Sequence, residues 1–297
     1  MTLQELILGT ERRFRAARLF YGHGTSNARD EAAFLVLRAL RLPFDVALSR
    51  KTTPAQEKKI ESLIRRRIKE RIPVPYLLNE AWLADHSFYV DRRVIIPRSH
   101  IAELLNKDIF PGKLDRILDL CTGSGCLAIL AALAFPRAQV DAVDLSKAAL
   151  EVAAKNVASY RLKRRIKLIR SDLFNELSGS YDLIITNPPY VDRKAMGTLP
   201  AEYRYEPGMA LAGGSDGLTL VKEIIEKAKH HLVPRGSLIC EIGDGRKALQ
   251  RAFPKLEFVW PETAAGTGQL FVLQMPYEIG DGLRCVKLVQ QFQGEHG

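Results

Sequence analysis

The stretch Arg116-Ile-Leu-Asp-Leu-Cys-Thr-Gly-Ser-Gly-Cys-Leu-Ala-Ile129 predicts a buried strand, a tight glycine turn and the start of a helix. Glycines let the backbone bend sharply and leave no Cβ between the chain and a ligand. A second predicted strand, Val140-Asp-Ala-Val-Asp144, ends in a carboxylate about 20 residues after the glycines, where such a group binds ribose hydroxyls. This order is typical of an α/β domain that binds a nucleotide-like ligand.

Three details distinguish this loop from an NAD site. Ala128 stands where the dinucleotide motif has its third glycine. Asp119, just before the turn, would repel a phosphate and suits an ammonium group, and Asp172, after the next predicted strand, suits the exocyclic amine of adenine. With Asp144, these carboxylates at successive strand ends predict a ligand with an ammonium, a ribose and an adenine but no phosphate. S-adenosylmethionine is that ligand, and a purely structural role of the carboxylates is the alternative.

A second motif follows the predicted strand Tyr181-Asp-Leu-Ile-Ile-Thr186, which stops at Asn187-Pro188-Pro189-Tyr190. Each proline fixes φ, lacks an N–H and pushes its predecessor into extended geometry. The Asn187 side-chain oxygen and the Pro188 carbonyl are therefore free to accept hydrogen bonds from one planar NH2 group, and Tyr190 supplies a flat wall. We predict that Asn187, Pro188 and Tyr190 are catalytic and that Asn187, Pro188, Pro189 and Tyr190 bind substrate. A proline-rich turn without chemistry is the alternative.

Both motifs lie at the carboxyl ends of predicted strands, where ligands bind in doubly wound sheets. The cofactor and the NH2 pocket are therefore expected to adjoin, so that the sulfonium methyl lies in line with the nitrogen and catalysis is mainly positioning. Two acceptors on the two N–H groups would aim the nitrogen lone pair at the methyl. An adenine or guanine amine, a glutamine amide and an asparagine amide all fit this pocket.

The chain is predicted to have three parts. Residues 1–75 form a small helical domain, in which Thr53-Pro-Ala-Gln56 is a capping box. Residues 76–110 form a hairpin with its turn at Asp91-Arg-Arg93, followed by a helix from Ile101 to Phe110 that Ser99 caps. Residues 111–297 alternate strands and helices, which predicts an α/β fold with a doubly wound, Rossmann-like sheet. Its seven strands are expected at 116–120, 139–144, 167–171, 181–186, 237–242, 257–260 and 269–274.

Charge is uneven along the chain, which has a net charge of +10. Residues 1–80 contain 16 Lys and Arg against 9 Asp and Glu, and thus carry +7 of this charge. A basic N-terminal third predicts a partner that carries phosphates or an acidic surface, such as RNA. Solvated helices without such a partner are the alternative.

Composition excludes several classes of protein. No apolar run approaches the length of a membrane helix, and the N-terminus lacks the basic-then-apolar order of a signal peptide. Cys121, Cys126, Cys240 and Cys285 form no Cys-x-x-Cys pair, and the six histidines lack the spacing of metal ligands. We therefore predict a cytoplasmic protein with reduced thiols and without a metal site.

Four motifs carry a resemblance to a known family: Asp-Leu-Cys-Thr-Gly-Ser-Gly-Cys (119–126), Ala-Val-Asp-Leu-Ser (142–146), Arg-Ser-Asp-Leu-Phe (170–174) and Thr-Asn-Pro-Pro-Tyr-Val-Asp (186–192). They resemble the protein-(glutamine-N5) methyltransferases, which also have a helical N-terminal domain and a hairpin. The resemblance covers nearly the whole chain and implies S-adenosylmethionine as cofactor and a glutamine amide as acceptor. It implies that the cofactor binds Cys121, Thr122, Gly123, Ser124, Gly125, Asp144, Asp172, Leu173 and Asn187, and that the glutamine binds Asn187 to Tyr190.

Within this family, the chain is similar to the branch that acts on large-subunit ribosomal protein L-three, free or in a ribosome precursor. The similarity lies in residues 96–104, in Cys121 at a usual glycine, and in residues 199–207. Two residues depart from the branch: His100 replaces a usual proline and Asp85 a usual glycine. Arg98 is predicted as a substrate contact, with a surface ion pair as the alternative.

The sequence motifs are compatible with other functions. Glutamine methylation of peptide chain release factors and methylation of an adenine amine in nucleic acid both fit the pocket. An NAD-dependent oxidoreductase would leave Asp119 and the Asn-Pro-Pro-Tyr corner unexplained, and a non-catalytic RNA-binding module would leave the three carboxylates unexplained. Glu206-Pro207 and Gly213-Gly214 lie in a long irregular stretch that is predicted to form a lid.

Overall fold

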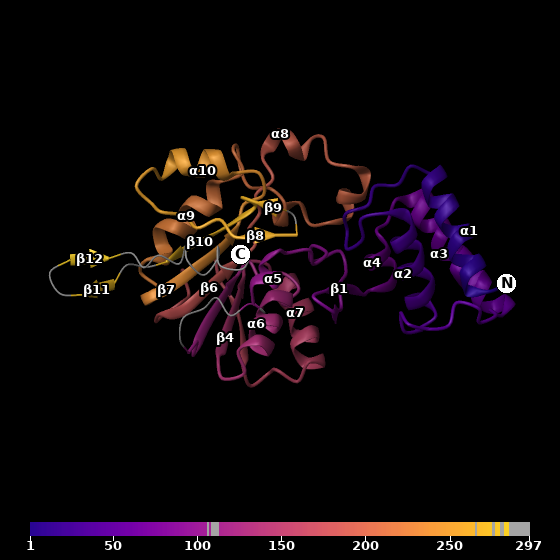
Figure 1. The fold of residues 1–297 in the computed structure, drawn as a ribbon, viewed down its shortest axis with the longest axis horizontal. Coiled ribbons are helices and arrows are strands. Elements are labelled where there is room, and N and C mark those ends of the chain that lie inside the picture. Colours follow the sequence, from indigo (N-terminus) through magenta and orange to yellow (C-terminus); the bar gives the residue numbers. More distant parts are fainter. Residues whose placement is uncertain (106, 108–112, 265, 275–276, 280–281, 285–297) are drawn as a thin grey trace, which may run out of the picture. The chain divides into compact units, whose positions relative to one another are not determined.

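The computed structural model describes residues 1–105, 107, 113–264, 266–274, 277–279 and 282–284. The chain forms two compact units, one made of Met1–Arg98 with Leu199–Pro207 and the other of Ser99–Thr198 with Gly208–Gly297 (Figure 1). We call them the helical unit and the sheet unit. The division of the chain into functional parts at residues 75 and 110 stays a prediction.

The helical unit contains α1 (Leu3–Ala16), α2 (Ala28–Ala39), α3 (Pro54–Glu70) and α4 (Val74–Leu78). Each of the first three helices begins at a side chain that accepts a hydrogen bond from its first turn, namely Thr2, Asn27 and Thr53. Thr53 and Gln56 form the predicted capping box, with proline at the first helical position. The apolar faces of these helices pack into one buried core that includes Phe14, Leu35 and Ile60. Burial of each such side chain stabilises the fold by roughly 1.5–3 kcal/mol.

The hairpin of the helical unit is shorter than predicted and turns at a different place. Strands β1 (Ala81–Leu83) and β2 (His86–Phe88) are joined by Ala84 and Asp85, whose φ angles are 47° and 61°. Two positive φ angles are what a two-residue hairpin turn needs, because they match the twist of its strands. Aspartate tolerates this conformation, which explains how Asp85 replaces the glycine usual in the branch. Asp91-Arg-Arg93 does form a turn, in which the Val94 amide donates to the Asp91 carbonyl at 3.1 Å, but this turn joins no strands, so the prediction of a hairpin there was wrong.

The sheet unit is built on six strands in the order β10-β7-β6-β3-β4-β5. The five strands from β3 to β7 are parallel, and β10 is antiparallel to β7. Figure 1 shows α6 and α7 on one side of the sheet and α9 and α10 on the other. This arrangement confirms the doubly wound, Rossmann-like fold. The strands are β3 (Arg116–Leu120), β4 (Gln139–Asp144), β5 (Ile166–Arg170), β6 (Tyr181–Thr186), β7 (Leu232–Glu241) and β10 (Leu270–Gln274).

Helices and short elements connect these strands. The helices of the sheet unit are α5 (Ile101–Leu105), α6 (Cys126–Ala134), α7 (Lys147–Ser159), α8 (Arg193–Met196), α9 (Thr219–Ala228) and α10 (Arg246–Ala252). The remaining elements are the 3-10 helices η1 (Ala201–Tyr205) and η2 (Gly208–Ala210) and the strands β8 (Glu262–Thr263), β9 (Gly266–Thr267), β11 (Tyr277–Ile279) and β12 (Gly282–Arg284). The end of the helix predicted to run to Phe110, and Cys285, lie outside the described residues.

The seventh strand, predicted at 257–260, is not part of the described sheet. Val259 makes a single antiparallel bridge with Val272, through two hydrogen bonds of 3.0 and 2.8 Å. The next pair of ladder bonds would need an N–H from residue 261, which is Pro261 and has none. A local run of apolar residues therefore packs against β10 without extending the sheet.

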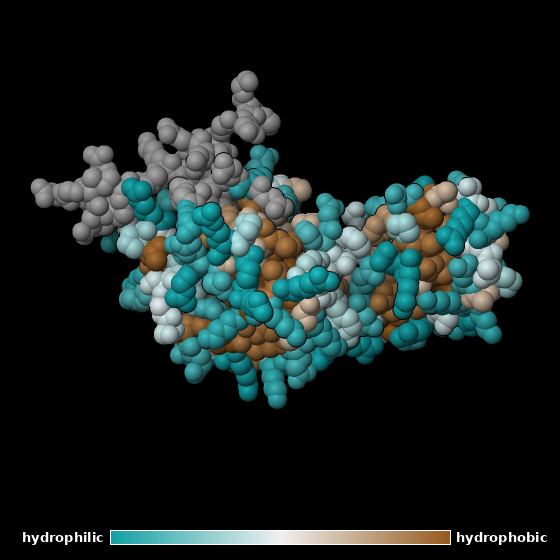
Figure 2. All heavy atoms as spheres, turned by 90° about the horizontal axis from the view of Figure 1, so that it is seen from below, coloured by the Kyte–Doolittle hydropathy of each residue, from teal (hydrophilic) through white to brown (hydrophobic). Residues whose placement is uncertain are grey.

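Apolar and polar residues divide between the inside and the surface as the sequence pattern predicts. Ile117, Leu118 and Leu120 of β3 are fully buried. On the face shown in Figure 2, apolar side chains are visible in gaps between hydrophilic ones. Among the residues that the structure describes, none of the helices has the length and apolarity needed to cross a membrane.

Candidate active site

The strand register brings the two sequence motifs to one edge of the sheet. Leu120 at the end of β3 pairs with Val143 of β4 on one side and with Thr186 of β6 on the other. Thr186 in turn pairs with Cys240 of β7. The residues that follow these strands, including Asn187, therefore emerge side by side at the carboxyl edge. This is where ligands bind in doubly wound sheets.

The loop after β3 wraps around the start of α6. Cys121, Gly123 and Gly125 all have left-handed φ angles, of 58°, 55° and 78°. The amide of Thr122 donates to the Val143 carbonyl at 2.9 Å, which ties the loop to β4. A Cβ on Gly125 would lie 3.1 Å from the Cβ of Ala153, so glycine is required there by both space and conformation. Cys121 takes its left-handed conformation without that freedom, at a cost of about 1–3 kcal/mol.

Asp119 organises this loop from inside. Its side chain is fully buried, and its Oδ2 accepts hydrogen bonds from the Thr122 hydroxyl at 2.6 Å and the Ala128 amide at 3.0 Å. Its Oδ1 is buried and has no hydrogen-bond partner among the described residues. Burial raises the pKa of Asp119 to about 7. Its predicted contact with a ligand ammonium stays a prediction, but the unpartnered oxygen is an acceptor that a bound cation would stabilise.

The carboxylate of Asp144 joins the ends of β3 and β4. Its Oδ2 accepts from the Gly123 amide at 2.9 Å, and its Oδ1 accepts from the Ser146 amide at 2.8 Å. Burial raises the pKa of Asp144, although these two N–H groups oppose the shift. Asp172 is exposed after β5, and the neighbouring Leu173 is buried with a φ of 46°. A carboxylate has about four acceptor positions, so Asp144 can still bind hydroxyl groups.

The Asn-Pro-Pro-Tyr corner leaves β6 beside this loop. The Thr186 hydroxyl donates to the Leu120 carbonyl at 3.0 Å, which holds the end of β6 against β3. The Asn187 side chain is half-buried and makes no hydrogen bond to the described part of the chain. Pro188 and Pro189 are buried, and Tyr190 is half-buried. A cavity of about 340 Å³ opens beside Tyr190. Tyr190 lines this cavity together with Gly217 and Gly243, whereas Asn187 and the loop after β3 do not.

A glycine-rich loop packs against the backbone of this corner. The sequence did not predict this contact. A Cβ on Gly213 would lie 2.6 Å from the Tyr190 Cα and 2.8 Å from the Pro189 carbonyl oxygen. The Val191 amide donates to the Leu211 carbonyl at 2.9 Å, and the Gly213 amide donates to the Val191 carbonyl at 2.8 Å. We call residues 211–217 the glycine support. Its ordering on binding, as predicted for a lid, stays a prediction.

Glu241 is a site residue that was not predicted from the sequence. It ends β7 beside the corner and is 2% exposed. Its carboxylate accepts hydrogen bonds from the Ser99 hydroxyl at 2.5 Å and the His100 amide at 3.2 Å. A proline at position 100, as usual in the branch, has no N–H to donate here, so the His100 departure adds a hydrogen bond. Ser99 also accepts from the Ile101 amide at 3.2 Å, as predicted for a cap.

Other predicted features are placed as follows. Arg98 belongs to the helical unit, where its guanidinium forms a two-point ion pair with Glu206 at 2.5 and 2.8 Å. Its predicted substrate contact stays a prediction. Cys121, Cys126 and Cys240 are free thiols, and burial raises the pKa of Cys126 to about 12. Within the described ranges, no group of three His, Cys, Asp or Glu side chains is arranged to hold a metal ion.

Comparisons with known proteins place this geometry in a family. The model of the methyltransferase small domain matches residues 100–202. The chain is 51% identical to the ribosomal protein uL3 glutamine methyltransferase of Bordetella pertussis, over 92% of this chain and 94% of that protein. The chain belongs to the ribosomal protein uL3 glutamine methyltransferase family. The enzyme of the same name from Burkholderia pseudomallei is 48% identical, over 92% of this chain and 94% of its own length.

Solved structures support the fold alone. The hMettl16 catalytic domain, in complex with a 3′UTR hairpin, matches with a TM-score of 0.52 and 15% sequence identity, over 79% of this chain and 87% of that one. The branch of the family that the sequence motifs indicated is confirmed by the two glutamine methyltransferases, which match this chain over nearly its full length.

Proposed function

We propose that this chain transfers a methyl group from S-adenosylmethionine to the side-chain amide nitrogen of a glutamine in ribosomal protein uL3. The observation that carries the proposal is the sharing of about half of all residues, over nearly the full length, with enzymes of that name. The geometry agrees, because the cofactor loop and the half-buried Asn187 emerge at one sheet edge.

The residues at this edge fit S-adenosylmethionine. Gly123 leaves open space over the loop, since a Cβ there would meet only the Cys121 carbonyl at 4.0 Å. Asp144 would accept from the ribose hydroxyls, and the exposed Asp172 from the adenine amine, with Leu173 beside the base. Asp119, with its unpartnered oxygen, supplies negative charge for the ammonium end. When bound, the cofactor supplies an electrophilic methyl carbon.

Asn187 and Pro188 would hold the acceptor. The Asn187 side-chain oxygen and the Pro188 carbonyl accept the two N–H groups of the glutamine amide, while Tyr190 packs against its plane. Because the amide lone pair is delocalised, fixing both hydrogens turns the lone pair toward the methyl carbon and stabilises the positive charge that grows on nitrogen. With the cofactor bound, the amide nitrogen held by Asn187 and Pro188 would take the methyl group as the bond between that methyl and sulfur breaks, which would leave a thioether, and the nitrogen would lose one proton to water or to a carbonyl. The chemistry is therefore mainly positioning.

The charge on the helical unit favours a binding partner that is larger than the glutamine side chain alone. Helix α3 exposes Lys58, Arg65, Arg66 and Lys69, two of which lie near glutamates at 3.4 and 3.9 Å. A basic surface of this kind favours contact with RNA phosphates. We therefore propose that the enzyme binds uL3 within a ribosome precursor, where RNA surrounds the substrate protein. A ribosomal substrate and reduced thiols also favour a cytoplasmic location.

The test is methylation by the purified enzyme with labelled cofactor. Purified uL3, a peptide chain release factor and deproteinised ribosomal RNA are offered separately, and labelled products are digested and identified by mass spectrometry. The expected result is label on one glutamine of uL3 and on neither other substrate. Label on the release factor would move the enzyme to the other branch, and label in RNA would refute amide methylation.

A further inference from the structure

Residues 199–207 belong to the helical unit, although the residues on both sides of them belong to the sheet unit. We call this segment the strap. Residues 191–198 join its first end to Tyr190, and residues 208–210 join its second end to the glycine support. The strap is therefore covalently continuous, in both directions, with the two loops that hold the Asn-Pro-Pro-Tyr corner. Whatever fixes the strap also limits the motion of those loops.

The first anchor of the strap is a buried ion network around Glu202. Its Oε1 accepts from Arg67 Nη1 at 3.2 Å and from the Phe20 amide at 3.1 Å, and Arg71 Nη1 lies at 3.4 Å. Arg67 is fully buried and also donates to Glu31 at 2.7 Å. Burial acts to raise the pKa of Glu202, but the Phe20 amide and Arg67 outweigh it and hold the pKa below its usual range. Glu202 is thus a charged group held from three sides.

The second anchor lies at the other end of the strap. Glu206 is 5% exposed and takes both ends of the Arg98 guanidinium, at 2.5 and 2.8 Å. The Ile96 amide also donates to Glu206, at 3.0 Å. Between the two anchors, the Tyr203 ring packs against the buried His23, with ring centroids 4.6 Å apart. Both glutamates are thus satisfied by geometrically demanding partners.

Buried ion pairs such as these contribute little to the free energy of unfolding. Burying two charges costs so much hydration that well-packed apolar residues often do as well or better, whereas an ion pair with fixed geometry specifies one position. We propose that Arg67 and Arg98 are positioning residues for methyl transfer, which hold Glu202 and Glu206 so that the strap fixes the loops on both sides of Tyr190. This inference rests on the proposed function, because misplacement of the acceptor by about 1 Å can lower turnover about 100-fold.

The experiment replaces each strap carboxylate by its amide, as Glu202→Gln and Glu206→Gln. The amides keep the shape of the side chains, whereas Arg67→Ala would take a shared guanidinium from the buried Glu31 and Glu202 and so weaken folding itself. With uL3 and cofactor both saturating, we expect kcat to fall about tenfold or more for each variant, while the cofactor Kd stays within about twofold.

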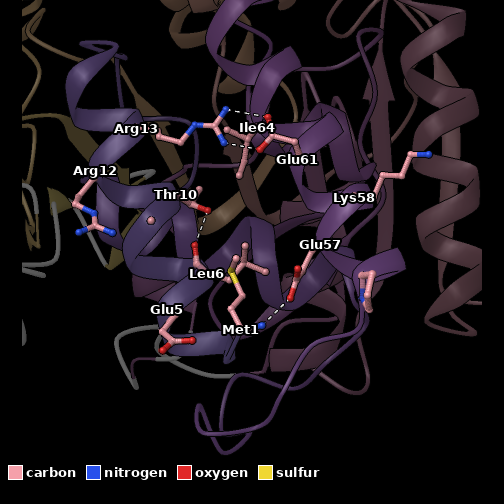
Figure 3. Close-up of a pocket in the computed structure, with 12 residues that line it drawn as sticks. Met1, Glu5, Leu6, Thr10, Arg12, Arg13, Glu57, Lys58, Glu61 and Ile64 are labelled. Carbon is pink, nitrogen blue, oxygen red and sulfur yellow. Dashed lines mark hydrogen bonds and ion pairs between the residues drawn. The ribbon is translucent and has the colours of Figure 1, made fainter.

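The matched control is Glu61→Gln. Glu61 on α3 forms a two-point ion pair with Arg13 of α1, at 2.5 and 3.1 Å (Figure 3), in which both side chains are 41% exposed; among the described residues, no hydrogen bond or ion pair joins this pair to the strap. We expect this variant to keep the kcat of the parent. A general weakening of the helical unit would lower the kcat of all three variants alike.

Hydrogen exchange supplies a readout that a merely structural role would not move. The amides of Val191 and Gly213 are bonded within the sheet unit, away from the substituted residues. At a temperature where every variant is folded, we expect both amides to exchange faster in Glu202→Gln and Glu206→Gln and to be unchanged in Glu61→Gln. A parent-like kcat in both strap variants would overturn the proposal, and so would parent-like protection of Val191 and Gly213.

Failure of this inference is distinguishable from failure of the proposed function. If the parent enzyme does not methylate uL3, the proposed function fails, and the exchange rates of Val191 and Gly213 still decide whether the strap holds the corner. If the parent methylates uL3 and the strap variants do so equally fast, the enzyme assignment stands and the positioning role of Arg67 and Arg98 is refuted.

Discussion

Gly213 offers the sharpest test of the site, because a single methyl group there meets the backbone of the catalytic corner. In Gly213→Ala, the new Cβ would lie 2.6 Å from the Tyr190 Cα and 2.8 Å from the carbonyl oxygens of Pro189 and Gly217. Ordinary contacts of a Cβ begin at 3.4 Å, so the Tyr190 backbone must retreat by about 0.8 Å. All three obstructing atoms belong to the backbone, so no side-chain rotation relieves the clash.

A retreat of this size displaces the group that faces the acceptor amide. We expect kcat to fall about 100-fold, which corresponds to about 2.7 kcal/mol in the activation free energy. Overpacking should also lower the free energy of unfolding by about 1–3 kcal/mol. The cofactor loop after β3 is not touched by the new methyl group, so the Kd for S-adenosylmethionine should stay within about twofold of the parent. The assay is steady-state methylation of uL3, with the cofactor Kd from calorimetry.

The matched control is Gly208→Ala in the same connection. A Cβ on Gly208, which begins η2, would meet nothing within 4 Å, and neither glycine has a left-handed φ, so the control adds the same methyl group without a clash. Gly208→Ala is expected to keep the parent kcat. The reasoning is refuted if Gly213→Ala keeps full activity, or if both alanine variants lose it equally.

Three further predictions concern single side chains. Asn187→Ala should lower kcat about 10²–10³-fold, because one preorganised acceptor is lost, and calorimetry should find cofactor binding largely intact. Because burial raises the pKa of Asp119 in the folded protein to about 7, its favourable contribution is complete at low pH and is lost as the pH rises from about 4 to about 7. The Tm of Asp119→Asn relative to that of the parent should therefore increase over this range and level off above it. A difference that is constant with pH would contradict this. Glu241→Ala should cost about 1–3 kcal/mol in urea unfolding, because the Ser99 hydroxyl and the His100 amide lose their acceptor, and Glu241→Gln should cost less.

Features encoded in a few adjacent residues were predictable from the sequence. The capping box at Thr53 is a local hydrogen-bonding pattern, and it begins a helix in the structure. The runs 116–120, 139–144 and 181–186 are strands with the predicted bounds, because buried apolar residues in parallel strands leave a continuous signal. The shared sheet edge followed from the rule that ligands bind beyond the carboxyl ends of such strands.

Features that depend on distant residues were not predictable in the same way. The run 257–260 has strand character, but whether it extends the sheet depends on its pairing with β10, which is distant in sequence; the adjacent Pro261 was a local signal against a strand. The hairpin turn at Ala84-Asp85 carries no glycine, so its positive φ angles left no composition signal. The contact of Gly213 with Tyr190 joins residues far apart in sequence. Glu241 does carry a local signal, because it is a charged residue at the end of a predicted strand, where the site of such a sheet lies.

The chemistry assigned to the corner explains why supporting residues should matter as much as contacting ones. An amide nitrogen gains acidity only as it is methylated, so no strong base is needed before the bond forms, and the acceptors can be a carbonyl and a neutral amide. Such acceptors gain little from pKa tuning and depend on direction and distance instead. Their placement comes from the Thr186 hydroxyl, the glycine support and, by our inference, the strap. Substitutions in these supports should therefore lower kcat while leaving the cofactor Kd unchanged, as is expected for Asn187→Ala.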